Sequence, residues 1–89
     1  MSRRRSLEVV MQAELVTVSE LVQLSGMRYS TLKYYTEIGI LPFNQLDMGL
    51  VRRYPRLHAL ERLVEIRSMK DNGMTIQQIV DHYQSKSAE

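Results

Sequence analysis

Glycine constrains this chain most, because Gly26, Gly39 and Gly73 each follow a stretch whose apolar residues have helical spacing. Glycine takes the left-handed conformation that ends a helix without a Cβ clash, so each is expected to close a helix. No internal repeat or low-complexity segment interrupts the pattern. It predicts a mostly helical fold, and a length of 89 residues predicts one small domain with a single core.

The segment from Thr17 to Gly39 has the pattern of two short helices joined by a tight turn. Thr17 and Glu20 form a capping box, so a helix begins there, and it ends at Gly26. A second helix is predicted over about residues 29–38. The predicted inward residues are Val18, Leu21, Val22 and Leu24 in the first helix, and Leu32, Tyr35 and Ile38 in the second. This is the helix-turn-helix unit, whose second helix can enter the DNA major groove, although many small helical proteins contain such a corner and bind no DNA.

Residues 40–54 change character and predict a two-stranded wing. Ile40-Leu41-Pro42 opens an extended run, residues 44–49 are typical of a turn, and residues 50–54 return as a strand. Pro55 suits the first turn of the helix that follows, because its missing N–H is not needed there. The wing therefore connects the helix-turn-helix unit to a further helix.

Two more helices are predicted after the wing, and one before the helix-turn-helix unit. The first runs to about Asn72, with a buried stripe of Leu57, Leu60, Leu63 and Val64. The second follows a capping box of Thr75 and Gln78 and has Ile76, Ile79, Val80 and Tyr83 on its apolar side. Residues 6–15 predict a short N-terminal helix that either covers the core as a flap or pairs with a second subunit; its apolar residues are Leu7, Val10, Met11 and Leu15. The fold class is mostly α: a winged helix-turn-helix with a small two-stranded wing and a short extra N-terminal helix.

Composition excludes several classes of protein. The chain has no cysteine, which excludes disulfides and thiolate metal sites, and no apolar run long enough to span a bilayer. A cytoplasmic protein with no membrane partner is therefore expected. The net charge is only +2, but residues 1–56 hold eight Arg or Lys against five acids, whereas residues 57–89 hold four against five. This concentration of positive charge suits a polyanion such as DNA.

The candidate DNA-binding residues gather on the second helix of the unit and on the returning wing strand. A DNA reader needs cations aimed at phosphates and polar side chains aimed at base edges, all on one face. Strand alternation sets Arg53 opposite to Arg52 and Tyr54, so both arginines face DNA only if the strand twists or bulges. Tyr34 either donates its hydroxyl to a phosphate or packs beneath the wing, while Tyr35 is assigned to the core. The full set is Arg28, Tyr29, Ser30, Lys33, Tyr34, Arg52, Arg53, Tyr54 and Arg56.

Catalysis is not expected of this chain. It has no glycine-rich phosphate loop, and its two histidines, His58 and His82, stand in no metal-ligand spacing. Glu61 and Glu65 are four residues apart, but the nearby Arg62 favours a solvated salt-bridge face over a pair of catalytic carboxylates. We therefore predict no enzymatic activity, no metal and no cofactor.

Several motifs together resemble the DNA-binding domain of MerR-type transcription regulators, over roughly residues 16–83. They are Thr17-Val18-Ser19-Glu20-Leu21, Ser25-Gly26-Met27, Thr31-Leu32-Lys33-Tyr34-Tyr35, Glu37-Ile38-Gly39-Ile40-Leu41 and Arg52-Arg53-Tyr54. The resemblance implies a dimer that binds an inverted repeat, with the second helix of the unit in the major groove and the wing beside it. It also implies that Lys33 stands where the family usually has arginine, that Tyr34 contacts a phosphate, and that Arg53 and Tyr54 close the wing.

Some positions depart from the family pattern. Arg28 stands where a small N-cap serine is common, and Ser30 stands where an arginine often helps to contact DNA. The run from Gly49 to Arg52 is one residue longer than the usual Gly-Tyr-Arg, which changes the register of the wing. The DNA sequence that is read should differ accordingly. Family members typically continue into a long dimerisation helix and a sensor, whereas this sequence ends at Glu89. No small-molecule effector site is therefore expected here.

The leading hypothesis is therefore a MerR-like transcription regulator that binds double-stranded DNA sequence-specifically, without an effector domain. It is expected to act as a homodimer or as a homo-oligomer assembled on DNA. Two alternatives remain open: an excisionase-like or plasmid-maintenance architectural factor that bends DNA, and a protein-interaction adaptor with a winged-helix fold. Along the chain we expect a basic arm with a short helix (1–16), the DNA-binding domain (17–83) and a polar tail (84–89).

Overall fold

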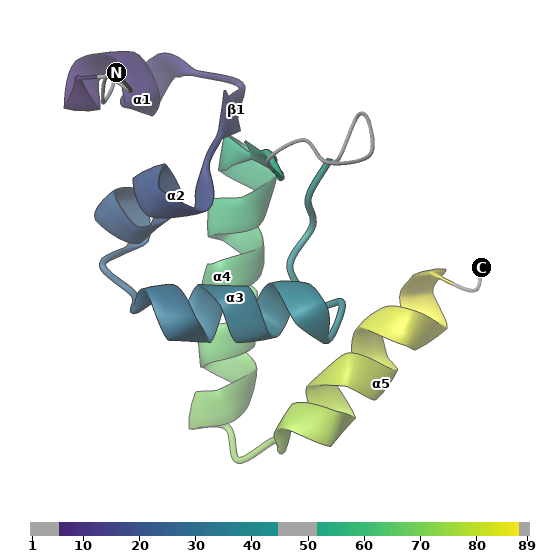
Figure 1. Cartoon of the computed structure of the whole chain (residues 1–89). Coiled ribbons are helices and arrows are strands. Elements are labelled where there is room, and N and C mark those ends of the chain that lie inside the picture. Colours follow the sequence, from purple (N-terminus) through teal and green to yellow (C-terminus); the bar gives the residue numbers. More distant parts are fainter. Residues whose placement is uncertain (1–5, 45–51, 88–89) are drawn as a thin grey trace.

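The chain folds into helices separated by tight turns, in a computed structural model that describes residues 6–44 and 52–87 (Figure 1). Its elements are α1 (Leu7–Gln12), β1 (Leu15–Val16), α2 (Val18–Ser25), α3 (Tyr29–Glu37), β2 (Tyr54–Pro55), α4 (Arg56–Asp71) and α5 (Ile76–Ser87). Gly26, Gly39 and Gly73 follow α2, α3 and α4 with φ values of 71°, 86° and 89°. The mostly helical fold class predicted from the sequence is confirmed. None of the helices in the described ranges is long and apolar enough to cross a membrane.

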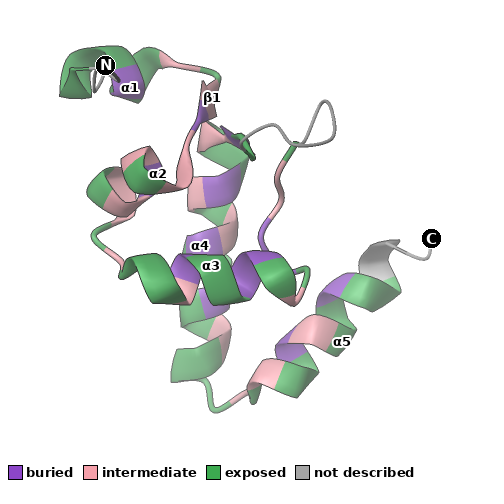
Figure 2. Ribbon diagram, viewed as in Figure 1, coloured by how far each residue is buried: buried purple, intermediate pink, exposed green. Residues whose placement is uncertain are grey.

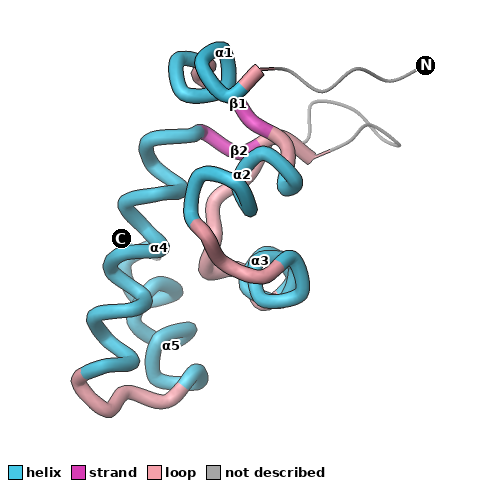
Figure 3. Tube along the Cα trace, turned by 90° about the vertical axis from the view of Figure 1, so that its left-hand side faces the viewer, coloured by secondary structure: helices cyan, strands magenta, loops and turns pink. Residues whose placement is uncertain are grey.

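Helix α4 is the axis around which the other elements gather. Figure 1 shows α4 running behind α3 through the middle of the molecule, and Figure 3 shows α2 and α3 on the same side of α4. Helix α2 contacts both α3 and α4, and α5 folds back along α4 after a tight turn. The core between them is apolar and draws on every element (Figure 2); it comprises Val10, Val16, Leu21, Leu32, Tyr35, Ile40, Leu41, Tyr54, Ala59, Leu63, Ile66, Ile79 and Tyr83.

The buried stripe of α4 differs from the predicted one. Ala59, Leu63 and Ile66 face the core, and Leu60 packs partly against it. Leu57 and Val64 were predicted to be buried, yet their side chains are 64% and 69% exposed. They lie seven residues apart, two turns along one outer face, whereas the core packs against the neighbouring face. The prediction was therefore wrong for these two residues and right for Leu63.

The N-terminal helix is shorter than the predicted span of residues 6–15. Helix α1 ends at Gln12, because Ala13 takes an extended conformation and its carbonyl accepts a hydrogen bond of 2.7 Å from the Arg56 guanidinium. Leu15 then belongs to β1 rather than to the helix. At the other end of the chain, α5 continues to Ser87, so its last turn includes residues assigned to the polar tail.

One strand pairing was not predicted from the sequence. Strand β2 pairs antiparallel with β1, with Leu15 opposite Pro55 and Val16 opposite Tyr54. Burial explains this pairing, because Val16 is 0% and Tyr54 only 2% exposed, so the core draws these two segments together. The described part of the wing is held by a single bridge, Asn44 to Arg53. The predicted turn at residues 44–49 lies, beyond Asn44, outside the described residues, as do Leu50 and Val51.

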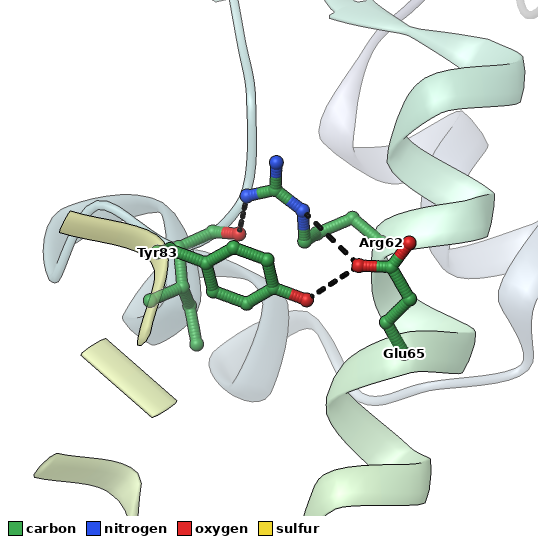
Figure 4. Close-up of polar contacts among 4 residues, drawn as sticks. Arg62, Glu65 and Tyr83 are labelled. Carbon is green, nitrogen blue, oxygen red and sulfur yellow. Dashed lines mark hydrogen bonds and ion pairs between the residues drawn. The ribbon is translucent and has the colours of Figure 1, made fainter. Parts of the chain in front are cut away.

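Helix α5 is fastened to α4 by a polar cluster around Tyr83 (Figure 4). The Tyr83 hydroxyl donates to Glu65 Oε1 at 2.7 Å, and the Arg62 guanidinium carbon lies 3.9 Å from the centre of the Tyr83 ring. Arg62 also donates to the Ile40 carbonyl at 2.8 Å, which ties the start of the wing to α4. Burial, followed by the hydrogen bond to Glu65, raises the pKa of Tyr83 above its usual value, so the phenol stays protonated and keeps donating.

Replacing Tyr83 with phenylalanine tests how much this cluster stabilises the fold. The ring stays while the donor to Glu65 is lost, so the free energy of unfolding should fall by about 0.5–1.5 kcal/mol. Tyr83→Ala also removes the ring and should cost about 3–5 kcal/mol. Urea denaturation followed by circular dichroism measures both. A Tyr83→Phe protein as stable as the wild type would show that ring packing alone fastens α5.

Candidate nucleic-acid interface

The turn between α2 and α3 sets the direction of the second helix. The capping box that begins α2 is present as predicted, with Glu20 N donating to Thr17 Oγ1 at 3.2 Å and Thr17 N donating to the Glu20 carboxylate at 2.9 Å. Gly26 ends α2 in the left-handed conformation, and its N–H donates to the Val22 carbonyl. The Ser25 hydroxyl then accepts from Met27 N at 3.1 Å. These local bonds turn the chain within three residues and leave α3 crossing in front of α4 (Figure 1).

Helix α3 has one buried face and one exposed face. Leu32, Tyr35 and Thr36 are buried, which confirms Tyr35 as a core residue. Figure 2 shows the opposite side of α3 as exposed. That side consists of Tyr29, Ser30, Lys33, Tyr34 and Glu37, and Arg28 lies exposed at the N-cap. Tyr34 is 48% exposed, and its contact with a phosphate stays a prediction.

A buried hydrogen bond joins α3 to the base of the wing. Thr36 Oγ1 lies 2.8 Å from the Tyr54 hydroxyl, and it also donates to the Leu32 carbonyl at 2.8 Å. Since Thr36 Oγ1 donates its proton to Leu32, it accepts the proton of Tyr54. Tyr54 is thus a core residue with only 2% exposure, and its hydroxyl donates to Thr36 of α3. Its assignment as a DNA contact is therefore corrected.

The returning arm of the wing carries Arg52 and Arg53 in different surroundings. Arg53 forms two backbone hydrogen bonds with Asn44, of 2.6 and 2.9 Å, and its side chain is exposed. The Arg52 guanidinium carbon lies 4.9 Å from the centre of the Phe43 ring, which packs in turn against Tyr54 with ring centres 6.3 Å apart. A cation–π contact of this kind restrains an exposed arginine without neutralising it. The contact with Phe43 therefore restrains the Arg52 guanidinium beside the wing.

A shallow hollow of about 180 Å³ lies where α3 meets the wing, and we call it the α3–wing hollow. Its described lining consists of Val18, Tyr29, Lys33, Arg52 and Tyr54. The alternation of the strand is visible here, because Arg52 and Tyr54 line the hollow and Arg53 is not among its described residues. Two cations and two tyrosines line it, and none of the described lining residues is acidic. Such a group of donors suits an anion, and a phosphate above all.

Arg56 does not join this group. Its Nε donates to the Ala13 carbonyl at 2.7 Å and its backbone N–H donates to the Glu14 carbonyl at 2.9 Å. Both bonds fasten the segment between α1 and β1 to the start of α4. Arg56 Nε therefore holds the N-terminal segment, and the assignment of Arg56 as a DNA contact stays a prediction.

Sequence reasoning missed two cations near the turn between the helices. Arg67 and Lys70 line a second hollow, of about 260 Å³, together with Met27, Tyr35, Ile66 and Asp71. Met27 lies in the turn that directly precedes α3, so these cations, here called the basic flank, extend the positive surface past the start of α3. Their spacing of three residues on α4 was a usable signal, since it places both on one helix face.

These features define a class of protein: a helix-turn-helix whose second helix exposes Arg28 and Lys33 beside a wing that exposes Arg52 and Arg53 is typical of a DNA-binding module. A family model described as MerR HTH family regulatory protein matches residues 16–86 of the chain. The match covers far more than half of the sequence, so the chain belongs to this family, and the resemblance is confirmed. Domains of this family bind DNA in transcription regulation and are not enzymes. No curated protein and no solved structure matches the chain.

The bond between Thr36 and Tyr54 can be measured by a double-mutant cycle. Thr36→Val and Tyr54→Phe each leave the other's hydroxyl without this partner, and we expect each to lower the free energy of unfolding by about 1–3 kcal/mol. The double variant should lose less than the sum of the two, because only one bond is broken. Chemical denaturation of the four proteins gives the coupling energy. Strictly additive losses would mean that the bond does not couple α3 to the wing.

Proposed function

We propose that this protein binds double-stranded DNA sequence-specifically as a transcription regulator. The observation that carries this proposal is the α3–wing hollow, in which Lys33 from α3 and Arg52 from the wing meet beside Tyr29. A helix fits the major groove, and a wing that begins at its side reaches the adjoining backbone. Neither element alone distinguishes a DNA reader from a solvated basic surface. The convergence of Lys33 and Arg52 in one hollow supports the DNA reader.

The exposed residues divide into two groups, one assigned to base edges and one assigned to phosphates. Ser30 and Lys33 project from the exposed side of α3, so they are assigned to base edges in the major groove. Arg28, Tyr34 and Arg52 border that side and are assigned to phosphates, which fix register without reading sequence. Tyr29 lines the α3–wing hollow and packs between the two groups. Arg53 extends the wing contact from its outer side.

The basic flank is assigned to the DNA backbone on the other side of α3. Arg67 and Lys70 lie next to Met27, at the end of α3 opposite the one that leads into the wing. Phosphates of a groove flanking α3 pass both sides of the helix, so cations on both sides increase affinity. With this assignment, α3 has cations on both of its sides: Arg52 on the wing side and the basic flank on the other side.

Two such modules are expected to act together. The exposed side of a nine-residue helix contacts only a few base pairs, so a single copy reads a short half-site. A homodimer reading an inverted repeat doubles the contact and raises affinity through effective concentration. Architectural DNA bending and protein adaptation are the alternatives that the following experiment separates from this proposal.

The first test selects bound duplexes from a random DNA pool near physiological salt, with wild type, Lys33→Ala and Arg52→Ala in parallel. The wild type should enrich an inverted repeat. Loss of a base contact by Lys33→Ala should cost about 1–3 kcal/mol and relax specificity at one position, whereas Arg52→Ala should weaken binding to all sequences alike. The exposed Gln77→Ala on α5 is the control and should bind as the wild type does. No enrichment with equal retention by Lys33→Ala would favour the adaptor hypothesis, and strong bending without enrichment would favour the architectural one.

The second test measures the basic flank. Lys70→Ala should lower the affinity for specific and nonspecific duplexes by the same factor, and it should reduce the salt dependence of binding by about one released counterion. Titrations by fluorescence anisotropy at several salt concentrations give this slope. An unchanged slope would place the basic flank away from the DNA.

A further inference from the structure

Tyr29 is the first residue of α3, and its side chain is 51% exposed. It stands four residues before Lys33, so the two side chains lie on the same side of the helix, and both line the α3–wing hollow. In a helix-turn-helix the N-terminal residues of the second helix contact base edges. Tyr29 therefore stands where a base-reading residue is expected, although its side chain is all carbon apart from the hydroxyl oxygen.

The α3–wing hollow is more apolar than its two cations suggest. More of its lining surface is apolar than polar, and its apolar residues are Val18, Tyr29 and Tyr54. Tyr54 is held from inside the core by its bond to Thr36, so this part of the wall stays in place. A phosphate pairs with a cation and gains nothing from an apolar wall. The wall therefore suits a second, apolar group of the DNA.

The major groove offers this wall one kind of apolar group. The base edges there carry hydrogen-bond donors and acceptors, except for the 5-methyl group of thymine. Cytosine carries the same group when it is methylated at that carbon. Contacts to sugars and phosphates position a protein on the backbone instead of reading bases. A pyrimidine 5-methyl group is therefore the apolar ligand that a residue on the groove side of α3 can reach.

We propose that the Tyr29 ring, together with Val18 in the same wall, contacts the 5-methyl group of a pyrimidine in the major groove, so that Tyr29 determines specificity at that base. Lys33 lies about 6 Å further along the helix axis, while successive base pairs are about 3.4 Å apart. The methylated pyrimidine is expected one or two base pairs from the base that Lys33 contacts. This inference rests on the proposed function, because it needs α3 in the major groove.

Changing the methyl group alone tests the contact. The duplex that the wild type enriches from the random pool is prepared with each thymine in turn replaced by uracil, which lacks only the 5-methyl group, and with each cytosine in turn replaced by 5-methylcytosine. Fluorescence anisotropy gives the affinities. At one position near the base of Lys33, affinity should fall about fourfold with uracil or rise about fourfold with 5-methylcytosine, the factor expected for burying one methyl-sized group. A fall identifies thymine as the source of the methyl group, and a rise identifies 5-methylcytosine.

The two exposed tyrosines of α3 give matched variants. Tyr29→Ala should bind the duplexes with and without the methyl group equally, whereas Tyr29→Phe keeps the ring and should discriminate as the wild type does. Tyr34→Ala removes a side chain of similar exposure, 48%, and should weaken binding to both duplexes without changing their ratio. Each ratio compares two duplexes bound by one protein, so partial unfolding of a variant does not alter it.

The proposal is overturned if no position changes the wild-type affinity by more than twofold, or if Tyr29→Ala responds to the methyl group as strongly as the wild type. Both results are compatible with specific DNA binding, so they contradict only the methyl contact. A wild type that enriches no duplex contradicts the proposed function, and the methyl contact with it.

Discussion

The hydrogen bond between Thr36 and Tyr54 is the constraint on which the rest of this structure depends. It is buried, so neither hydroxyl can exchange it for water, and breaking it would leave a polar group unpaired in the core. It joins α3 to β2, and β2 is paired with β1. The bond thus ties α3 to the returning arm of the wing, and Lys33 and Arg52 line the same hollow. A contact inside the core therefore helps to position the surface proposed to face DNA.

Local signals in the sequence predicted the helices well and the strands poorly. Thr17 with Glu20, Gly26 and Gly39 act through bonds within a few residues, so their effect can be read from the chain alone. Strand β1 has no such local signal: Leu15 fits a helix pattern, and only its pairing with Pro55 makes it a strand. Contacts between residues distant in the sequence also limited the prediction of the candidate site. Lys33 could be proposed from its place on a helix face, but the burial of Tyr54 depends on Thr36, 18 positions earlier in the chain.

Helix α4 shows why apolar spacing alone could not choose its buried face. Leu57, Leu60 and Val64 have helical spacing, and so do Ala59, Leu63 and Ile66. The second set is buried because α2 and α5 both pack on that side, with Arg62 and Glu65 positioned to bind Tyr83. The larger side chains of the first set would have suggested the opposite choice. A small residue such as Ala59, which is 0% exposed, allows the close approach of neighbouring elements.

The two apolar sets of α4 differ in burial. The face with Ala59, Leu63 and Ile66 completes the core, whereas Leu57 and Val64 lie exposed on the outer face. Helix α4 also carries the basic flank at its C-terminal end and Arg56 at its N-terminal end. One 16-residue helix thereby contributes to the core through Leu63 and Ile66 and to the basic flank through Arg67 and Lys70, so the packing of α4 sets the position of both.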